Sequence, residues 1–255
     1  MPTYRTARLH LKRCIALAKL LEDQIGSTSW YKKSTIVGFG FLVRHRRLAE
    51  AVLELGKDYA YEAQILLRCM IEIHYNHKWI LLTAKERRAN RFLKFDLLER
   101  LKISDSLSKS MDPNEYAAKS KKLKSKCAKV RHLFRLRDNK NKFVWAKSWA
   151  SVTSFEGRLM KVLKPRNGEP DKFLYALYRY FSSNVHGGPM SISQVLESSH
   201  TIQAKLQPES EPEKQIRGAF LVLIDSIRTL AENTSMIESL EPELPKLEKI
   251  AYRHV

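Results

Sequence analysis

Residues 178–188 include a cation, a hydroxyl and an imidazole at a spacing that could hold and cleave a phosphodiester. In their sequence, YRYFSSNVHGG, Arg179 and His186 are seven positions apart and Ser182 and His186 are four apart. On a continuous helix these three side chains share one face. An imidazole can exchange a proton near neutral pH, and a guanidinium can stabilise the negative charge that develops on phosphate oxygens. The alternative interpretation is a histidine at a helix end, bonded to a carbonyl, with capping serines beside it.

A second polar pair, Arg68 and Glu72, interrupts the most apolar stretch of the chain, AQILLRCMIEIHYNHKWILL. The two residues are four positions apart and therefore lie on one face of a helix. Charged groups in so apolar a helix are costly unless they are paired or used in chemistry. Two interpretations stay open: the pair takes part in catalysis, or it is a buried ion pair that holds neighbouring helices in register. Further polar residues follow one turn beyond the pair: His74, Asn76 and His77.

A Lys-rich segment at 117–142 predicts contacts with phosphates. From residue 119 onward its sequence is KSKKLKSKCAKVRHLFRLRDNKNK, in which Asp138 is the single acid. Aromatic residues that can stack on bases lie in or just beyond it: Phe134, Phe143, Trp145 and Trp149. The alternative is a solvated helix face that leads into a pair of core tryptophans. The candidate nucleic-acid-binding residues are Lys119, Lys121, Lys122, Lys124, Lys126, Lys129, Arg131, Arg135 and Arg137.

The charge balance of the whole chain also favours an anionic partner. There are 46 Lys and Arg against 27 Asp and Glu, a formal net charge of +19. Such a surplus repels itself unless something anionic is near. Nucleic acid is the commonest partner of this kind, because bound Lys and Arg release the counterions of the phosphates. An anionic membrane surface ranks second, and a basic solvated surface without a partner is the third interpretation.

Other classes of protein are not supported by the residues. The three cysteines are scattered without a CxxC spacing, which favours reduced thiols over disulfides or a zinc site. HExxH, Walker and Gly-x-Ser-x-Gly patterns are absent, so neither a metal nor a cofactor is expected. The longest apolar stretch, Ile36 to Val43, is too short to span a bilayer, and no secretory signal is visible. We therefore expect a cytoplasmic protein without membrane insertion.

The elements that must position these residues are predicted to be helices. Gly and Pro are scarce, with nine of each in 255 residues, which favours helices over the many turns of a β fold. We expect a single all-α domain over residues 1–255, a bundle of about seven to nine helices around a central helix at 59–82. Ser27-Thr28-Ser29 can cap the second helix, which should end near Gly56.

The remaining helices follow from periodicity and from the positions of Gly and Pro. The last long helix, at about 213–240, should bury one face, made of Ile216, Phe220, Leu223, Ile224, Ile227 and Leu230. A polar loop is expected at 198–212 and a terminal helix after Pro245. The other expected helices cover about 5–25, 84–101, 114–137, 154–163 and 170–185.

The Arg179-x6-His186 pattern resembles the Arg-x4-6-His motif of HEPN proteins, an all-helical nucleotide-binding superfamily. The wider layout also resembles a bacterial family of unknown function. That family has an Arg-x3-Glu on an early apolar helix, matched by Arg68 and Glu72, and then a Trp-containing stretch. It continues with a Tyr-x3-Ser-x3-His-Gly motif, matched by Tyr178, Ser182, His186 and Gly187. The resemblance covers roughly residues 55–189.

This resemblance implies a function. HEPN ribonucleases are metal-independent toxins and phage-defence effectors that dimerise, so that two Arg/His motifs form one site in which the RNA 2′-hydroxyl attacks the adjacent phosphate. By resemblance, His186 is the acid/base and Arg179 the phosphate clamp. The position after the arginine is usually polar in these nucleases, and here it is Tyr180.

The residues and the resemblance together indicate two alternative functions. The first is a HEPN-like, metal-independent endoribonuclease with RNA as its favoured nucleic acid and a homodimer as its implied state. The second is a non-enzymatic nucleic-acid-binding or scaffolding subunit of a bacterial defence or mobile-element complex. In that case a protein partner from the same operon is expected, the Lys-rich segment carries the affinity, and the polar residues hold the bundle together.

Overall fold

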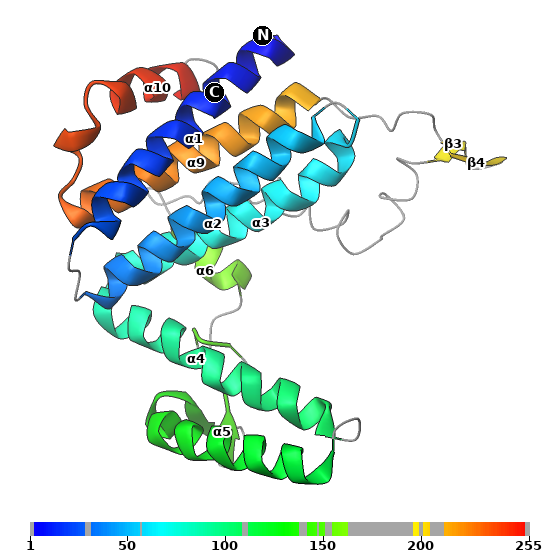
Figure 1. The fold of residues 1–255 in the computed structure, drawn as a ribbon, viewed down its shortest axis with the longest axis vertical. Coiled ribbons are helices and arrows are strands. Elements are labelled where there is room, and N and C mark those ends of the chain that lie inside the picture. Colours follow the sequence, from blue (N-terminus) through cyan, green and yellow to red (C-terminus); the bar gives the residue numbers. More distant parts are fainter. Residues whose placement is uncertain are drawn as a thin grey trace.

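The computed structural model of the protein describes a set of helical segments and a few short strands (Figure 1). The prediction of an all-α fold is confirmed, since the described part of the chain contains eight α-helices and only strands of three or four residues. The described residues are 3–28, 32–56, 58–108, 112–137, 142–146, 148–150, 155–162, 196–198, 201–204 and 212–252.

Four long helices form the bundle: α1 (Tyr4–Gly26), α2 (Lys33–Leu55), α3 (Ala60–Leu82) and α9 (Pro212–Thr234) (Figure 1). They assemble because apolar residues recur every three or four positions and so form one buried stripe on each helix. All six residues predicted to line the buried face of α9 are at most 3% exposed. Together with α10 (Glu243–Tyr252), these helices enclose the main hydrophobic core.

Helix α3 is the central element, as its composition predicts. No residue of α3 from 63 to 80 is exposed, and the helix contacts α2, α9, α4 and α6 (Phe155–Val162). Gly38 on α2 permits one of the close approaches. A Cβ at this position would lie 2.8 Å from Nε2 of His77 on α3 and 2.8 Å from Cδ1 of Leu230 on α9. The glycine therefore allows α2, α3 and α9 to pack closely at this point.

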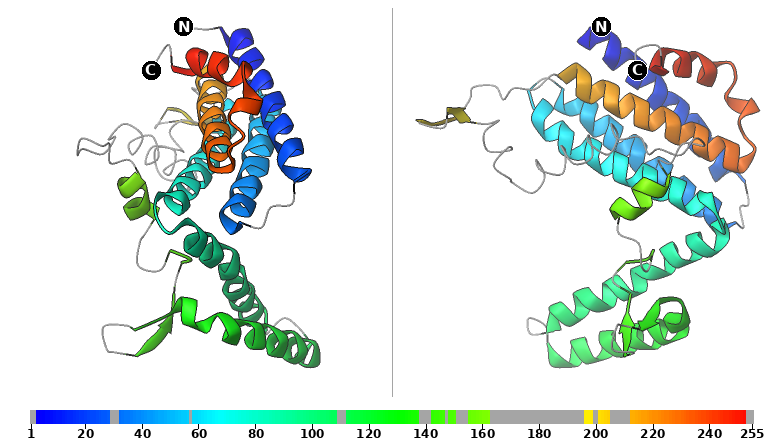
Figure 2. Two further views of the ribbon diagram at one scale, coloured as in Figure 1. Left: turned by 90° about the vertical axis from the view of Figure 1, so that its left-hand side faces the viewer. Right: turned by 180° about the vertical axis from the view of Figure 1, so that it is seen from behind.

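Helices α4 (Lys85–Ser106) and α5 (Pro113–Phe134) form an arm that extends from the bundle (Figure 2). The two helices run antiparallel. Near the end of α4 and the start of α5, the Tyr116 hydroxyl donates to Asp105 at 2.9 Å, and the end of α5 lies farther back along α4, where the Phe95 and Phe134 rings are 5.5 Å apart. A second hydrophobic core joins the arm to α2 and α3. It is built largely of aromatic side chains, among them Phe41, Trp79, Phe95, Phe134 and Trp149.

The short elements complete the described chain. Strands β1 (Arg135–Arg137) and β2 (Phe143–Trp145) pair antiparallel, as do β3 (Leu196–Ser198) and β4 (Thr201–Ala204). A 3-10 turn, η2 (Glu238–Leu240), connects α9 to α10. None of the described helices combines the length and the apolar character that crossing a bilayer requires.

The start of α2 differs from the prediction. The hydroxyls of Ser27 and Thr28 donate to the carbonyl of Gln24 and so close α1 instead of capping α2. The free amides of α2 are met by Glu86 of α4, whose carboxylate accepts from the backbone N–H of Lys33 at 2.9 Å and of Ser34 at 3.3 Å. A carboxylate is favoured there because the first N–H groups of a helix lack intrahelical partners.

Other predicted boundaries are also wrong. Helix α5 ends at Phe134, not near residue 137, because Arg135–Arg137 form the β1 strand paired to β2. The segment 198–212, predicted as a loop, contains β4, and the last long helix ends at Thr234 instead of near residue 240. The terminal helix begins at Glu243, before Pro245. The predicted helix at 170–185 lies outside the described residues.

Candidate functional site

The predicted polar pair on α3 forms an ion pair. Nη2 of Arg68 lies 2.9 Å from Oε1 of Glu72, and the two side chains are 13% and 35% exposed. Both charges come from the same helix, so the contact is made within α3. Cys69 lies between them, and its thiol pKa is raised, chiefly by burial and then by the charge of Glu72.

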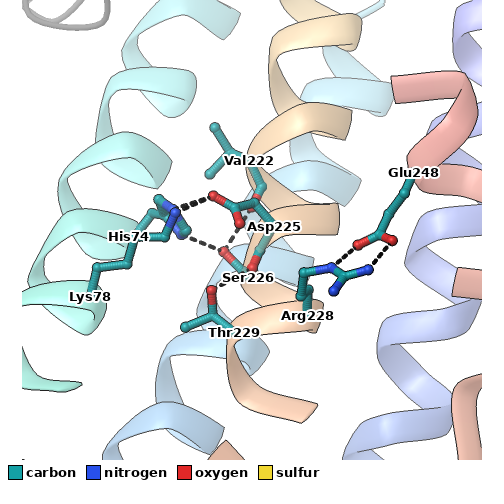
Figure 3. A network of polar contacts seen from close by, with 8 residues as sticks. All are labelled: His74, Lys78, Val222, Asp225, Ser226, Arg228, Thr229 and Glu248. Atoms are coloured by element: carbon teal, nitrogen blue, oxygen red, sulfur yellow. Dashed lines mark hydrogen bonds and ion pairs between the residues drawn. The ribbon is translucent and has the colours of Figure 1, made fainter. Parts of the chain in front are cut away.

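A larger polar network crosses the bundle between α3 and α9 (Figure 3). Oδ2 of Asp225 on α9 lies 2.9 Å from Nε2 of His74 and 2.5 Å from Nζ of Lys78, both on α3. Burial alone would raise the pKa of Asp225, but the hydrogen bond from His74 and the positive charge of Lys78 lower it well below its usual range. The carboxylate is therefore ionised at neutral pH and holds two helices together.

The protons of this network depend on the state of His74. Its Nδ1 lies 3.0 Å from Oγ of Ser226, which lies 2.7 Å from the carbonyl oxygen of Val222. Burial lowers the pKa of His74, against the opposing effects of Asp225, so the ring is neutral at neutral pH. The Ser226 hydroxyl donates its one proton to the Val222 carbonyl, so it does not also donate to Nδ1 of His74.

Serine, histidine and aspartate are also the three residue types of the catalytic triad of hydrolases. Here, however, Ser226 is 2% exposed and His74 is 4% exposed. A substrate does not reach a hydroxyl so deeply enclosed. The network therefore stabilises the contact between α3 and α9 and performs no nucleophilic chemistry.

Replacing Asp225 with asparagine is expected to destabilise the protein by about 2 kcal/mol, because a charge-assisted partner of both His74 and Lys78 is removed. Chemical denaturation at pH 7.5 measures the loss. The matched control is Glu232→Gln, which removes a carboxylate from the same helix whose only described partner is the exposed Arg228, at 3.1 Å. Equal losses in both variants would contradict the role assigned to Asp225.

Two more histidines are buried next to this network. His45 on α2 is 0% exposed and its Nε2 lies 2.9 Å from the carbonyl oxygen of Met70, while its Nδ1 has no hydrogen-bond partner among the described residues. His77 is 1% exposed, and its Nε2 has no partner there either. The rings of His45 and His74 are 6.2 Å apart. No set of three His, Cys, Asp or Glu side chains in the described chain converges as metal ligands.

The predicted nucleic-acid-binding residues of α5 surround a buried seam. The helix turns Ser120, Cys127, Val130 and Phe134 inward, all at most 4% exposed. Lys122, Lys126 and Lys129 follow an i, i+4, i+7 spacing along one flank of this seam. Lys121, Lys124 and Arg131 lie on the opposite flank. All six side chains are exposed, and none forms an ion pair with a described residue.

Only some of the predicted site residues lie in the part of the chain that the structure describes. Arg179, Ser182 and His186 lie outside the described residues, so their geometry stays a prediction. Lys119 belongs to α5, whereas Arg135 and Arg137 belong to β1, so the basic segment spans a helix and a strand instead of one helix. Arg68 and Glu72 lie on the bundle helix α3, and the lysines of α5 lie on the arm.

The sequence analysis missed Asp225 and Ser226. Their signal was the same as that of Arg68 and Glu72, since both interrupt the apolar stretch FLVLIDSI of α9. His74 and His77 were noticed beside the charged pair, but nothing in the sequence connects them with a residue about 150 positions later.

Residues 35–203 match the sequence profile of a family described as a family of unknown function (DUF5677). The match runs from α2 to β4, so it includes Arg68, Glu72, the basic helix α5 and the segment with Arg179 and His186. It excludes α1, α9 and α10. Neither the curated proteins nor the solved structures gave a match.

Proposed function

The chain belongs to DUF5677, a family of unknown function, and from the cationic surface of α5 we propose that it binds nucleic acid and acts on RNA. The supporting observation is the set of six exposed cations on α5, none of which is paired with a described carboxylate. Exposed Lys and Arg without acidic partners keep their full attraction for phosphates. On the neighbouring helix α4, Asp96 pairs with Arg100 of the same helix at 2.7 Å.

The catalytic part of the proposal rests on Arg179 and His186. Their spacing resembles the HEPN motif, and an imidazole beside a guanidinium suits attack of a 2′-hydroxyl on the adjacent phosphate. His186 takes the proton from the hydroxyl and returns one to the leaving oxygen, while Arg179 stabilises the phosphate charge. On this proposal the protein is a metal-independent endoribonuclease of a toxin or phage-defence type, and two chains complete one site.

A non-enzymatic nucleic-acid-binding or scaffolding protein is the second candidate. The observation in its favour is that Arg68 pairs with Glu72 within α3, and that the contact of His74 with Asp225 joins α3 to α9 with His74 buried. Binding would then reside in the arm, and the bundle would serve as its support. The two candidates share the α5 surface and differ in whether RNA is cut.

Reversing the charge of Lys121, Lys122, Lys124 and Lys126 to glutamate is expected to weaken binding of single-stranded RNA by more than about 10²-fold at low salt. Loss of about four phosphate contacts should also reduce the slope of log K against log salt by about 3 to 4. Fluorescence anisotropy with a labelled oligonucleotide over a salt series measures both quantities.

The matched control reverses four exposed cations at the other end of the molecule: Arg5, Lys12, Lys246 and Lys249. This variant has the same net charge as the α5 variant, so a general electrostatic effect would weaken binding equally in both. If the slope of log K against log salt is the same in the α5 variant as in the unaltered protein, α5 is only a solvated face.

A further inference from the structure

The exposed cations of α5 form two rows, one on each side of its outward face. The first row is Lys122, Lys126 and Lys129, and the second row is Lys121, Lys124 and Arg131. Successive residues of an α-helix are about 100° apart around its axis. Lys124 and Lys126 are therefore about 160° apart, and so are Lys129 and Arg131. The two rows point to opposite sides of the helix, so one straight line of phosphates does not reach both.

The inward side of α5 is fixed on α4, which gives both rows a rigid support. Sγ of Cys127 donates to the carbonyl oxygen of Leu97 on α4 at 3.4 Å, and Phe134 is 0% exposed. The outward strip between the rows includes Ala118 and Ser125, whose short side chains are exposed. A partner can therefore approach this strip closely while the longer cations reach past it on both sides.

No acidic residue interrupts either row. The chain contains no Asp or Glu between positions 117 and 137, a range that includes both rows completely. On the neighbouring helix α4, Asp96 pairs with Arg100 at 2.7 Å, and Asp105 accepts from the Tyr116 hydroxyl at 2.9 Å. None of the six cations forms an ion pair within the described chain. Both rows therefore keep their attraction for phosphates.

Two of the aromatic residues that were predicted to stack on bases are buried. Phe134 is 0% exposed and Trp149 is 8% exposed, because both belong to the hydrophobic core that joins the arm to the bundle. The side chains of Phe143 and Trp145 lie outside the described residues. Proteins that bind single strands stack successive bases on exposed aromatic rings. The described face of α5 offers cations without such rings, which suits a double helix whose bases are already stacked on one another.

The dimensions of the two rows are compatible with one groove of a duplex. The rows run from position 121 to position 131, which is about 15 Å at a rise of about 1.5 Å per residue. A duplex presents a phosphate about every 3.4 Å on each strand, so this length faces about four phosphates per strand. The minor groove of an RNA duplex is wide and shallow. A helix that lies along this groove, about 10–12 Å wide with its side chains, has one row beside each strand.

We propose that α5 binds double-stranded RNA along its minor groove, with the first row on the phosphates of one strand and the second row on those of the other. This inference rests on the proposed function, because it specifies the form of RNA that the α5 surface takes. A rigid duplex reaches both rows at once. A single strand must curl around the helix to do so, and it loses conformational freedom in that state.

The test compares three labelled ligands of one sequence and length on the full-length protein: an RNA duplex, single-stranded RNA and a DNA duplex. Fluorescence anisotropy over a salt series gives each affinity and the slope of log K against log salt, and a denaturing gel confirms that the RNA stays intact. The RNA duplex is expected to bind at least about tenfold more tightly than the single strand, with a slope of about −5 from six contacts at about −0.9 each.

Two variants separate the rows, and each removes three positive charges. The first-row variant is Lys122→Gln/Lys126→Gln/Lys129→Gln, and the second-row variant is Lys121→Gln/Lys124→Gln/Arg131→Gln. Glutamine has a high helix propensity, so both variants should fold. Each is expected to weaken binding of the RNA duplex more than about tenfold and to reduce the steepness of the slope by about 3. The control removes the same charge from exposed cations of α1 and α10: Arg5→Gln/Lys12→Gln/Lys246→Gln.

The outcomes separate this inference from the proposed function. Similar losses in both row variants, with the control unchanged, support contact with two strands. A single strand that binds as tightly as the duplex, or a loss confined to one row variant, would show that the two-strand contact is wrong while α5 still binds nucleic acid. A DNA duplex that binds as tightly as the RNA duplex would overturn the choice of RNA. If no ligand binds, or if both row variants bind like the control, the proposed function of α5 fails as well.

Discussion

RNA cleavage in the presence of EDTA is expected to fall at least about 10²-fold when His186 is replaced by alanine. On the proposed mechanism this imidazole moves the proton of the attacking 2′-hydroxyl, and no other group in the Arg179-x6-His186 motif can take over that transfer. Single-turnover cleavage of total RNA and of transfer RNA measures the effect, and EDTA excludes a contribution from divalent cations.

The matched control is His132→Ala, which removes an exposed histidine of α5. It should retain cleavage, because His132 lies on α5 and is not part of the Arg179-x6-His186 motif. Circular dichroism and the thermal midpoint of His186→Ala should equal those of the original protein. A variant that loses its fold together with its activity would indicate a structural role for His186. Absence of cleavage by the unaltered protein, with salt-dependent binding retained, would favour the scaffolding function.

Acid is expected to destabilise the protein steeply below pH 6.5, because two buried histidines cannot accept protons in the folded state. Burial, with a smaller effect of His74, lowers the pKa of His45 to about 3, and burial with the charges of His74 and Lys78 lowers the pKa of His77 to about 3. In the unfolded chain both rings titrate near pH 6.5.

The sign follows from proton counting. Between pH 6.5 and 3 the unfolded chain binds protons that the folded chain does not, so stability rises with pH in this window and is lost as pH falls. At pH 5 each histidine lowers the free energy of unfolding by about 2 kcal/mol relative to neutral pH. Asp225, whose folded pKa is lowered, adds a further loss only below about pH 4.

Urea denaturation at pH 7.5, 6 and 5 measures this loss. His77→Leu is the informative variant, since leucine has a similar volume and Nε2 of His77 has no hydrogen-bond partner among the described residues. It should flatten the decline by about 2 kcal/mol at pH 5. His132→Ala, at an exposed position, should leave the decline unchanged. If the free energies of unfolding of His77→Leu and His132→Ala decline in parallel with falling pH, His77 is protonated in the folded protein.

Local periodicity was enough to predict much of the fold. The buried face of α9 and the central position of α3 follow from apolar residues that recur at helical spacing, a signal contained within one helix. The basic surface of α5 was also predictable, because Lys and Arg are so frequent in this helix that both flanks of its buried face carry them. Arg68 and Glu72 pair because four positions make one turn.

Where the sequence analysis was wrong, a distant residue decided the outcome. Ser27 and Thr28 had the right chemistry to cap α2, but a carboxylate 53 positions away in α4 took that place. Three residues predicted as the end of a helix became β1, because β2 supplies a partner strand that no local pattern reveals. Propensity is a small energy that tertiary pairing overrides.

By itself, then, the sequence determined an all-helical chain with a buried central helix and a strongly basic surface, since these depend on residue type and on spacing within one helix. Only the tertiary structure joined His74 to Asp225, 151 positions apart, and gathered the cations of α4 and α6 on two tryptophans. Such contacts form between side chains whose helices meet only after the bundle has packed, so the spacing of residues within either helix does not reveal which residue of the other helix they contact.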